Sequence, residues 1–324
     1  MTIERNVAIT LGVLVATLVI GSIVRFVSLR RADPETRHQR MASLRTWWVL
    51  VTLTVVSVAL GSTAVALMLA IATCLGLREL EALSVERADR WLPRYAVHGL
   101  SLLWFGWLSV AAPQQFPGEL FYALILLLTA IHVFFGTLSS FTRRVSIHTW
   151  GWIVVAGGLG HCVLLTSLPA AENETAGTMG WFLFVLILTE ISDISQALVG
   201  RQLGRRRLAP ILSPKKTWEG FLGGLVATPM VSMLLAPWLT SLASGAPAWA
   251  PETNWPTWTG PLLAGVMVTS VGLIGDLNMS AVKRCAGVKD SSQLLPGMGG
   301  MLDRVDSLTF TAPAFYAFVH WWCI

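Results

Sequence analysis

The chain has 324 residues, of which 54% are hydrophobic and only 13% are charged. A soluble globular protein carries about 25% charged residues, so this composition excludes an ordinary soluble domain and predicts an all-α polytopic membrane protein. The net charge of +5 would suit nucleic acid. In a membrane protein, however, Lys and Arg gather on the cytoplasmic side, and we therefore expect no nucleic-acid partner.

Ten apolar segments are candidates to cross the membrane, because about 20 mostly apolar residues span its hydrocarbon core. The second and third adjoin at Gly61-Ser62 and predict either a tight hairpin or one long tilted helix, so nine or ten transmembrane helices are expected. In chain order the segments are 7–26, 47–60, 63–77, 95–112, 121–135, 150–168, 181–199, 221–243, 262–277 and 308–324.

The apolar segments divide the chain into loops, and the basic residues fall almost entirely on one side of the membrane. With ten spans, the loops on one side of the membrane, together with Arg25 at the edge of the first of them, hold 22 of the 23 Lys and Arg residues, and only Arg5 falls elsewhere. The positive-inside rule makes that side cytoplasmic and puts both termini outside. We expect an N-terminal transmembrane part (1–177) and a C-terminal catalytic region (178–324) in the inner, cytoplasmic membrane, with catalytic loops facing the cytoplasm.

The fourth basic loop carries a first polar motif. Glu190 and Asp193 lie three residues apart on one helix face, and acidic residues in a span are costly unless they serve a site or a partner. Pairing with Arg201 near the surface is the structural alternative. The stretch SPKKTWEG that follows combines a turn with ammonium and hydroxyl groups, which bind phosphate or, alternatively, anionic lipid. Candidates here are Asp193, Ser213, Lys216 and Thr217.

The fifth basic loop carries a second and richer motif. Four aspartates offer the oxygen ligands that Mg²⁺ prefers, four basic residues can neutralise phosphates, and glycines allow close backbone approach. Together they are typical of phosphoryl or nucleotidyl transfer, with a solvated salt-bridged loop as the alternative. The residues are Asp276, Asp290, Asp303, Asp306, Lys283, Arg284, Lys289, Arg304, Gly297, Gly299 and Gly300.

The stretch GDLNMSAVKRCAGVKDSSQLLPGMGGMLDRVDS resembles the C-terminal signature of the phosphatidate cytidylyltransferases, the CDP-diacylglycerol synthases. The segment from Asp193 to Gly220 is also similar to this family, and the resemblance covers the C-terminal two-fifths of the chain. The signature positions are Ser280, Lys283, Arg284, Lys289, Asp290, Leu295, Pro296, Gly297, Gly299, Gly300, Asp303, Arg304 and Asp306.

The resemblance implies transfer of CMP from CTP to phosphatidic acid in the membrane, with release of pyrophosphate. It implies Mg²⁺ held by Asp276 and Asp303, with room for a second cation, and it allows a homodimer. The catalytic residues implied are Asp193, Lys283, Arg284, Lys289, Asp290, Arg304 and Asp306. Substrate-binding residues implied are Ser213, Lys216, Thr217, Ser280, Gly299 and Gly300.

The chain departs from the family pattern at two places. Met298 stands where the family has His, and a thioether neither donates a proton nor binds phosphate well. Gln196-Ala197 stands where the family often has Ala-Tyr. Two other interpretations stay open: CTP-dependent transfer to another lipid phosphate or polyprenol, and a catalytically silent lipid-binding or transport paralogue.

Overall fold

The computed structural model describes residues 4–29, 33–83, 91–113, 115–136, 138, 141–168, 176–244, 247–253 and 255–324. Four of the arginines counted in the basic loops lie outside the described residues: Arg30, Arg31, Arg87 and Arg90. The N-terminal helices are α1 (Arg5–Ser28), α2 (Pro34–Leu60), α3 (Ser62–Leu83), α4 (Trp91–Ala111), α5 (Gly118–Phe135), α6 (Phe141–Gly151), a π-helical turn η3 (Trp152–Gly157) and α7 (Gly158–Leu165). The C-terminal elements are α8 (Gly177–Leu203), β1 (Arg207–Ala209), β2 (Ser213–Thr217), α9 (Trp218–Leu239), a 3₁₀ turn η5 (Leu242–Ser244), α10 (Thr259–Cys285), α11 (Leu302–Val305) and α12 (Leu308–Cys323).

The prediction of an all-α polytopic membrane protein is confirmed. Within the described residues, eight helical segments are long and apolar enough to cross a membrane. They are α1, residues Arg37–Leu60 of α2, α3, α5, the continuous segment Phe141–Leu165, α8, α9 and α10. The two remaining apolar segments predicted from the sequence form α4 and the shorter α12, which has 16 residues.

The structure has a hairpin at Gly61-Ser62 and not a single tilted helix, since α2 ends at Leu60 and α3 begins at Ser62. Gly61 has φ +101°, a left-handed conformation that glycine adopts without steric cost, and the chain reverses there between α2 and α3. The sequence predicts a loop over residues 27–46, but the structure places most of these residues in a helix. α2 begins at Pro34, so the second span extends into the predicted loop. This extension contacts the polar C-terminal loop, since Gln39 and Ser43 lie against Gly297.

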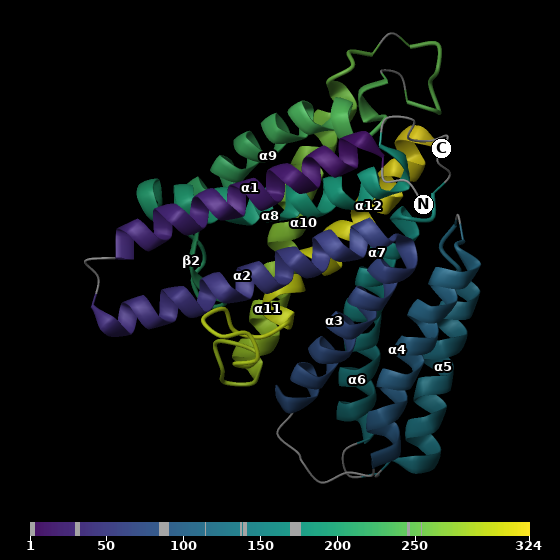
Figure 1. Ribbon diagram of the computed structural model, residues 1–324. Coiled ribbons are helices and arrows are strands. Elements are labelled where there is room, and N and C mark those ends of the chain that lie inside the picture. Colours follow the sequence, from purple (N-terminus) through teal and green to yellow (C-terminus); the bar gives the residue numbers. More distant parts are fainter. Residues whose placement is uncertain are drawn as a thin grey trace.

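Two groups of helices build the molecule (Figure 1). Helices α8, α9, α10 and α12 pack together, while α3 to α7 form a bundle beside them and α12 packs on α7. Buried aromatic side chains fill both groups, with Trp104, Phe121 and Trp152 in one and Trp181, Phe184 and Phe315 in the other. Helices α1 and α2 run side by side along one flank of the molecule.

The α8–α9 pair is held close by small residues, as is usual between membrane helices. A Cβ at Gly220 would lie 2.6 Å from the Gln196 carbonyl oxygen, so only glycine lets the two backbones approach this far. The Thr217 hydroxyl accepts a hydrogen bond from the Gly220 N–H at 3.1 Å and so caps α9. The sequence around β2 therefore starts α9 at a defined place.

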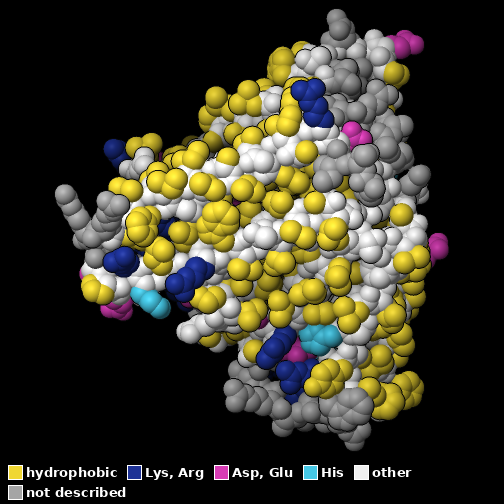
Figure 2. All heavy atoms as spheres, viewed as in Figure 1, with side chains coloured by type: hydrophobic (Ala, Val, Ile, Leu, Met, Phe, Trp, Pro, Cys, Tyr) yellow, Lys and Arg dark blue, Asp and Glu magenta, His cyan; other side chains and the backbone are white. Residues whose placement is uncertain are grey.

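The surface matches a membrane environment. Hydrophobic side chains cover much of the face in Figure 2, and most of its Lys and Arg side chains lie toward the lower left, away from the two termini. The loop before α11 lies at that same end, below α2 in Figure 1. Basic side chains are thus concentrated on this face toward the end of the molecule that carries the two polar motifs.

Candidate functional site

The first polar motif folds into a small hairpin that presents Lys216 to α10. Strands β1 and β2 pair antiparallel, with Ala209 opposite Ser213. The Lys216 Nζ lies 2.6 Å from Oδ2 of Asp276, whose other oxygen accepts a hydrogen bond from the Ser280 hydroxyl at 3.3 Å. The structure therefore joins the two motifs, which are far apart in the chain.

Two further carboxylates lie near this ion pair. Asp193 on α8 interacts electrostatically with Lys216 and Asp276, and Asp306 interacts with Asp276 and Asp193. The Oδ1 atom of Asp193 is buried and accepts no hydrogen bond from the described residues. Lys216 thus faces three acidic side chains, while Lys283 also interacts with Asp306 and Arg304 with Asp193. The oxygen of Asp193 that has no hydrogen bond makes this place favourable for a further cation.

The second ion pair links the ends of the C-terminal loop. Lys283 Nζ on α10 lies 2.6 Å from Oδ1 of Asp303 on α11. Oδ2 of Asp303 accepts from the Ser291 N–H at 3.0 Å, the Ser291 hydroxyl at 3.0 Å and the Gly300 N–H at 2.9 Å. Asp303 is therefore bonded to four donors.

These contacts shift the pKa values of the site. Burial lowers the pKa of Lys216, but Asp276 and Asp193 outweigh it and the net pKa is raised. Burial raises the pKa of Asp303, but the hydrogen bond from Lys283 and those from Gly300 and Ser291 outweigh it and the net pKa is lowered. Burial, together with Asp276 and Asp193, raises the pKa of Asp306 well above its usual range. Lys216 is thus charged and Asp303 ionised at neutral pH.

The donor set around Asp276 fits a divalent cation better than that around Asp303. Across the described residues, no three His, Cys, Asp or Glu side chains converge as a preformed metal site. The unbonded oxygen of Asp193 and the nearby side chains of Asp276 and Asp306 nevertheless offer the hard oxygen donors that Mg²⁺ prefers. Asp276 and Asp303 are each paired with a lysine, so either would have to exchange a present donor for the ion, and Asp303 has more donors to lose. The assignment of Asp276 and Asp303 to Mg²⁺ stays a prediction.

The other predicted residues lie around these pairs. Arg284 donates from Nε to the Leu212 carbonyl at 3.2 Å and so ties the end of α10 to the β1–β2 turn. Lys289, Asp290 and Arg304 are exposed. Their side chains face the solvent at the same end of the molecule, where a charged substrate has access to them.

The glycines of the loop accommodate protein groups. Gly297 has φ +73°, and a Cβ there would lie 2.8 Å from the Gln39 carbonyl and from the Ser43 nitrogen of α2. Gly299 has φ +88°, and its Cβ would lie 2.7 Å from Oδ2 of Asp303. Any side chain at either position would displace α2 or Asp303. Substrate binding by Gly299 and Gly300 stays a prediction.

Sequence reasoning missed the residues of the N-terminal half that hold this loop. The Thr46 hydroxyl on α2 donates to the Pro296 carbonyl at 3.0 Å, and the Glu79 carboxylate on α3 accepts from the hydroxyls of Ser291 and Ser292. The available signal was a glutamate at the end of an apolar segment. In the sequence, Arg87, Arg90 and Arg94 follow Glu79, and this loop counts only among the basic loops.

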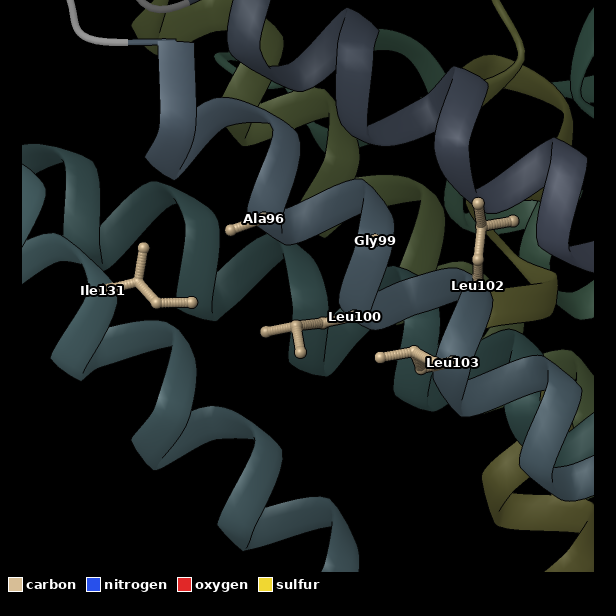
Figure 3. Close-up of a pocket in the computed structure, with 6 residues that line it drawn as sticks. All are labelled: Ala96, Gly99, Leu100, Leu102, Leu103 and Ile131. Atoms are coloured by element: carbon tan, nitrogen blue, oxygen red, sulfur yellow. The ribbon is translucent and has the colours of Figure 1, made fainter.

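A groove between α4 and α5 is unrelated to this chemistry (Figure 3). Its lining is entirely apolar and consists of Ala96, Gly99, Leu100, Leu102, Leu103 and Ile131. Without a polar group, the groove can neither bind a phosphate nor assist a reaction.

Comparison with known proteins agrees with these motifs. Residues 41–322 match the cytidylyltransferase family. The chain is 34% identical to "Uncharacterized protein YnbB" of Escherichia coli over 319 residues, 97% of this chain and 98% of that protein. It is 35% identical to a phosphatidate cytidylyltransferase of Pseudomonas aeruginosa over 198 residues, 60% of this chain and 68% of the relative.

A further relative is similar over a shorter region. A phosphatidate cytidylyltransferase of Synechocystis is 48% identical over 130 residues, which is 40% of this chain and 39% of the relative. High identity is thus concentrated in part of the chain, whereas similarity to the E. coli protein extends over nearly all of it.

Proposed function

The chain belongs to the cytidylyltransferase family, and on that premise we propose that it transfers CMP from CTP to phosphatidic acid, giving CDP-diacylglycerol and pyrophosphate. One observation carries the proposal: two lysine–aspartate pairs, Lys216–Asp276 and Lys283–Asp303, come from both polar motifs and lie at one end of a membrane-helix bundle. Relatives named phosphatidate cytidylyltransferase support the choice of lipid.

The proposed reaction requires positioning and charge neutralisation more than proton removal. A phosphate oxygen of phosphatidic acid bonds to the α-phosphorus of CTP, and the bond from that phosphorus to the oxygen bridging to the β-phosphate breaks, releasing pyrophosphate. The nucleophile is already an anion at neutral pH, so no strong general base is needed. The barrier falls mainly because donors of fixed position stabilise the charge on the transferring group.

The basic side chains supply this stabilisation. Lys216 and Lys283 are held in place by their aspartate partners, so their ammonium groups need little reorganisation to contact a triphosphate. Arg304 and Lys289 are exposed and add positive charge that a triphosphate can reach from the solvent. A divalent cation at Asp276, with Asp193 nearby, would neutralise further phosphate charge.

Location supports the same proposal. The protein is an integral membrane protein with the polar motifs, marked by β2 and α11 in Figure 1, at one end of its spans. We place that end at the cytoplasmic face of the inner membrane, because the basic loops gather there and CTP is a cytoplasmic nucleotide. The lipid substrate reaches the site from within the bilayer.

Turnover of the purified protein in detergent tests the proposal. With Mg²⁺, radiolabelled CTP and phosphatidic acid, we expect labelled CDP-diacylglycerol and stoichiometric pyrophosphate. Asp303→Asn should lower kcat/KM by about 100-fold or more while the protein stays folded, because it removes the charge that holds Lys283.

Asp33→Asn is the matched control, since it makes the same change at an exposed carboxylate outside the site. Its turnover should equal that of the wild type. Undiminished turnover by Asp303→Asn would exclude Asp303 from the site. CTP binding without product would contradict transfer to phosphatidic acid and favour another lipid acceptor or a catalytically silent paralogue.

A further inference from the structure

Glu79 of α3 is a buried carboxylate, and both of its oxygens accept hydrogen bonds from a loop that is distant in the sequence. Its Oε1 accepts from the Ser292 hydroxyl at 2.7 Å and the Met301 N–H at 2.8 Å. Its Oε2 accepts from the Ser291 hydroxyl at 2.8 Å and the Leu302 N–H at 2.9 Å. The side chain is 5% exposed, so these bonds replace the hydration of a buried charge.

The four bonds join the two ends of the loop that contains the Leu-Pro-Gly-Met-Gly-Gly turn. Ser291 and Ser292 open the loop, whereas Met301 and Leu302 close it at the start of α11. Both ends therefore depend on a carboxylate supplied by the N-terminal half of the chain. A Cβ at Gly300 would collide with the Glu79 carboxylate and the Ser291 hydroxyl, which explains why this position holds glycine.

The same contacts connect Glu79 to the proposed reaction centre. The Ser291 hydroxyl lies 2.8 Å from Glu79 and 3.0 Å from Asp303, and its single proton is shared between the two carboxylates. Asp303 in turn bonds Lys283. A chain of direct contacts thus runs from α3 through Ser291 and Asp303 to the ammonium group that would meet the triphosphate.

We propose that Glu79 is a positioning residue of the reaction, which holds residues 291–302 in the conformation that aligns Asp303 and Lys283. This inference rests on the proposed cytidylyl transfer. Glu79 does not touch substrate and acts through the loop. Its loss should therefore lower kcat more than it changes the KM for CTP.

Glu79→Gln is the most direct test, because it keeps the size of the side chain and replaces one accepting carboxylate oxygen with an NH₂ group. Whichever way the amide lies, its NH₂ group faces either the Met301 or the Leu302 N–H, which loses its acceptor. We expect faster hydrogen exchange at the amides of Met301 and Leu302 without any substrate. We also expect a fall in kcat of about 10- to 100-fold, as for a misaligned catalytic group.

Glu81→Gln is the matched control on the same helix. Glu81 contacts Arg94, His98 and His148. These three partners belong to α4 and α6 rather than to the loop, and the variant should leave the exchange of the loop amides and kcat within about twofold of wild type. Its melting temperature shows how much a lost buried carboxylate alone affects the protein.

Ser291→Ala is a milder second variant, in case Glu79→Gln does not fold. It removes only the shared hydroxyl, and we expect a smaller loss of kcat that is not additive with that of Glu79→Gln. Unchanged loop exchange in folded Glu79→Gln, or equal loss of kcat in Glu81→Gln, would overturn the proposal. If the wild type forms no product, the proposed function fails, and loop exchange alone then decides whether Glu79 holds the loop.

Discussion

The aspartates of the site are distinguished by their partners. Asp303 is bonded to four donors, Asp276 is paired with Lys216, and the buried Oδ1 of Asp193 has no hydrogen bond from the described residues. Residues of one type in one motif therefore differ in what they can do. Asp303 is suited to ordering the loop, whereas the group around Asp276 is suited to accepting more positive charge.

Met298 is the residue at which the chain departs from the family pattern. It lies half-buried in the turn, and its N–H donates to the Leu295 carbonyl at 2.9 Å. Because this backbone bond does not depend on the side chain, Met298→His should fold normally. Cytidylyl transfer should be preserved or raised, since an imidazole can bind phosphate or transfer a proton.

Met298→Leu, a nearly isosteric apolar change, is the control and should leave turnover within about threefold. Initial rates at saturating CTP compare the three proteins. A loss of more than about tenfold in Met298→His alone would show that the surrounding site is adapted to methionine.

At the scale of elements, the packing of α7 on α12 joins the two groups of helices. A Cβ at Gly158 would collide with the Thr309 carbonyl of α12, so the helices cross at van der Waals distance only because residue 158 is glycine. α12 begins at Leu308, two residues after Asp306, and this crossing therefore also fixes where the C-terminal loop ends.

Gly158→Ala should destabilise the protein by about 1–3 kcal/mol, because the added methyl group forces backbone apart in a packed interior. The melting temperature in detergent should fall by several degrees. Gly106→Ala on α4 is the control, since no atom lies within 4 Å of its added Cβ. Equal melting temperatures for the two variants would contradict the close α7–α12 contact.

At the scale of the whole molecule, charge distribution predicts orientation. The exposed Cys285 lies at the end of α10, next to Arg284, at the basic end of the molecule. Cys162 is buried, while Cys74 and Cys323 are half-buried. A single thiol therefore reports which side of the membrane carries the site.

A variant with Cys74, Cys162 and Cys323 changed to alanine should react with a membrane-impermeant maleimide in inverted vesicles and not in sealed right-side-out vesicles. The reason is that the positive-inside rule places the Cys285 end in the cytoplasm. Removing Cys285 as well should abolish labelling in both preparations. Labelling of right-side-out vesicles alone would reverse the orientation.

The sequence by itself determined the class of protein, the ten helical apolar segments, the sorting of basic residues and the two polar motifs. Those features are local, since hydropathy, charge and motif spacing are read from neighbouring residues. The sequence pattern also identified the two lysines and two aspartates that form the ion pairs, although their pairing came from the structure.

Only the tertiary structure decided how the two halves of the chain cooperate. The break at Gly61 positions α3, α3 brings Glu79 to Ser291 and Leu302, and the extended α2 brings Thr46 to Pro296. Such contacts join residues more than 200 positions apart, and no periodicity or local motif encodes which distant carboxylate will meet which backbone N–H. The physical reason is that burying Glu79 is favourable only when the complete loop is folded around it.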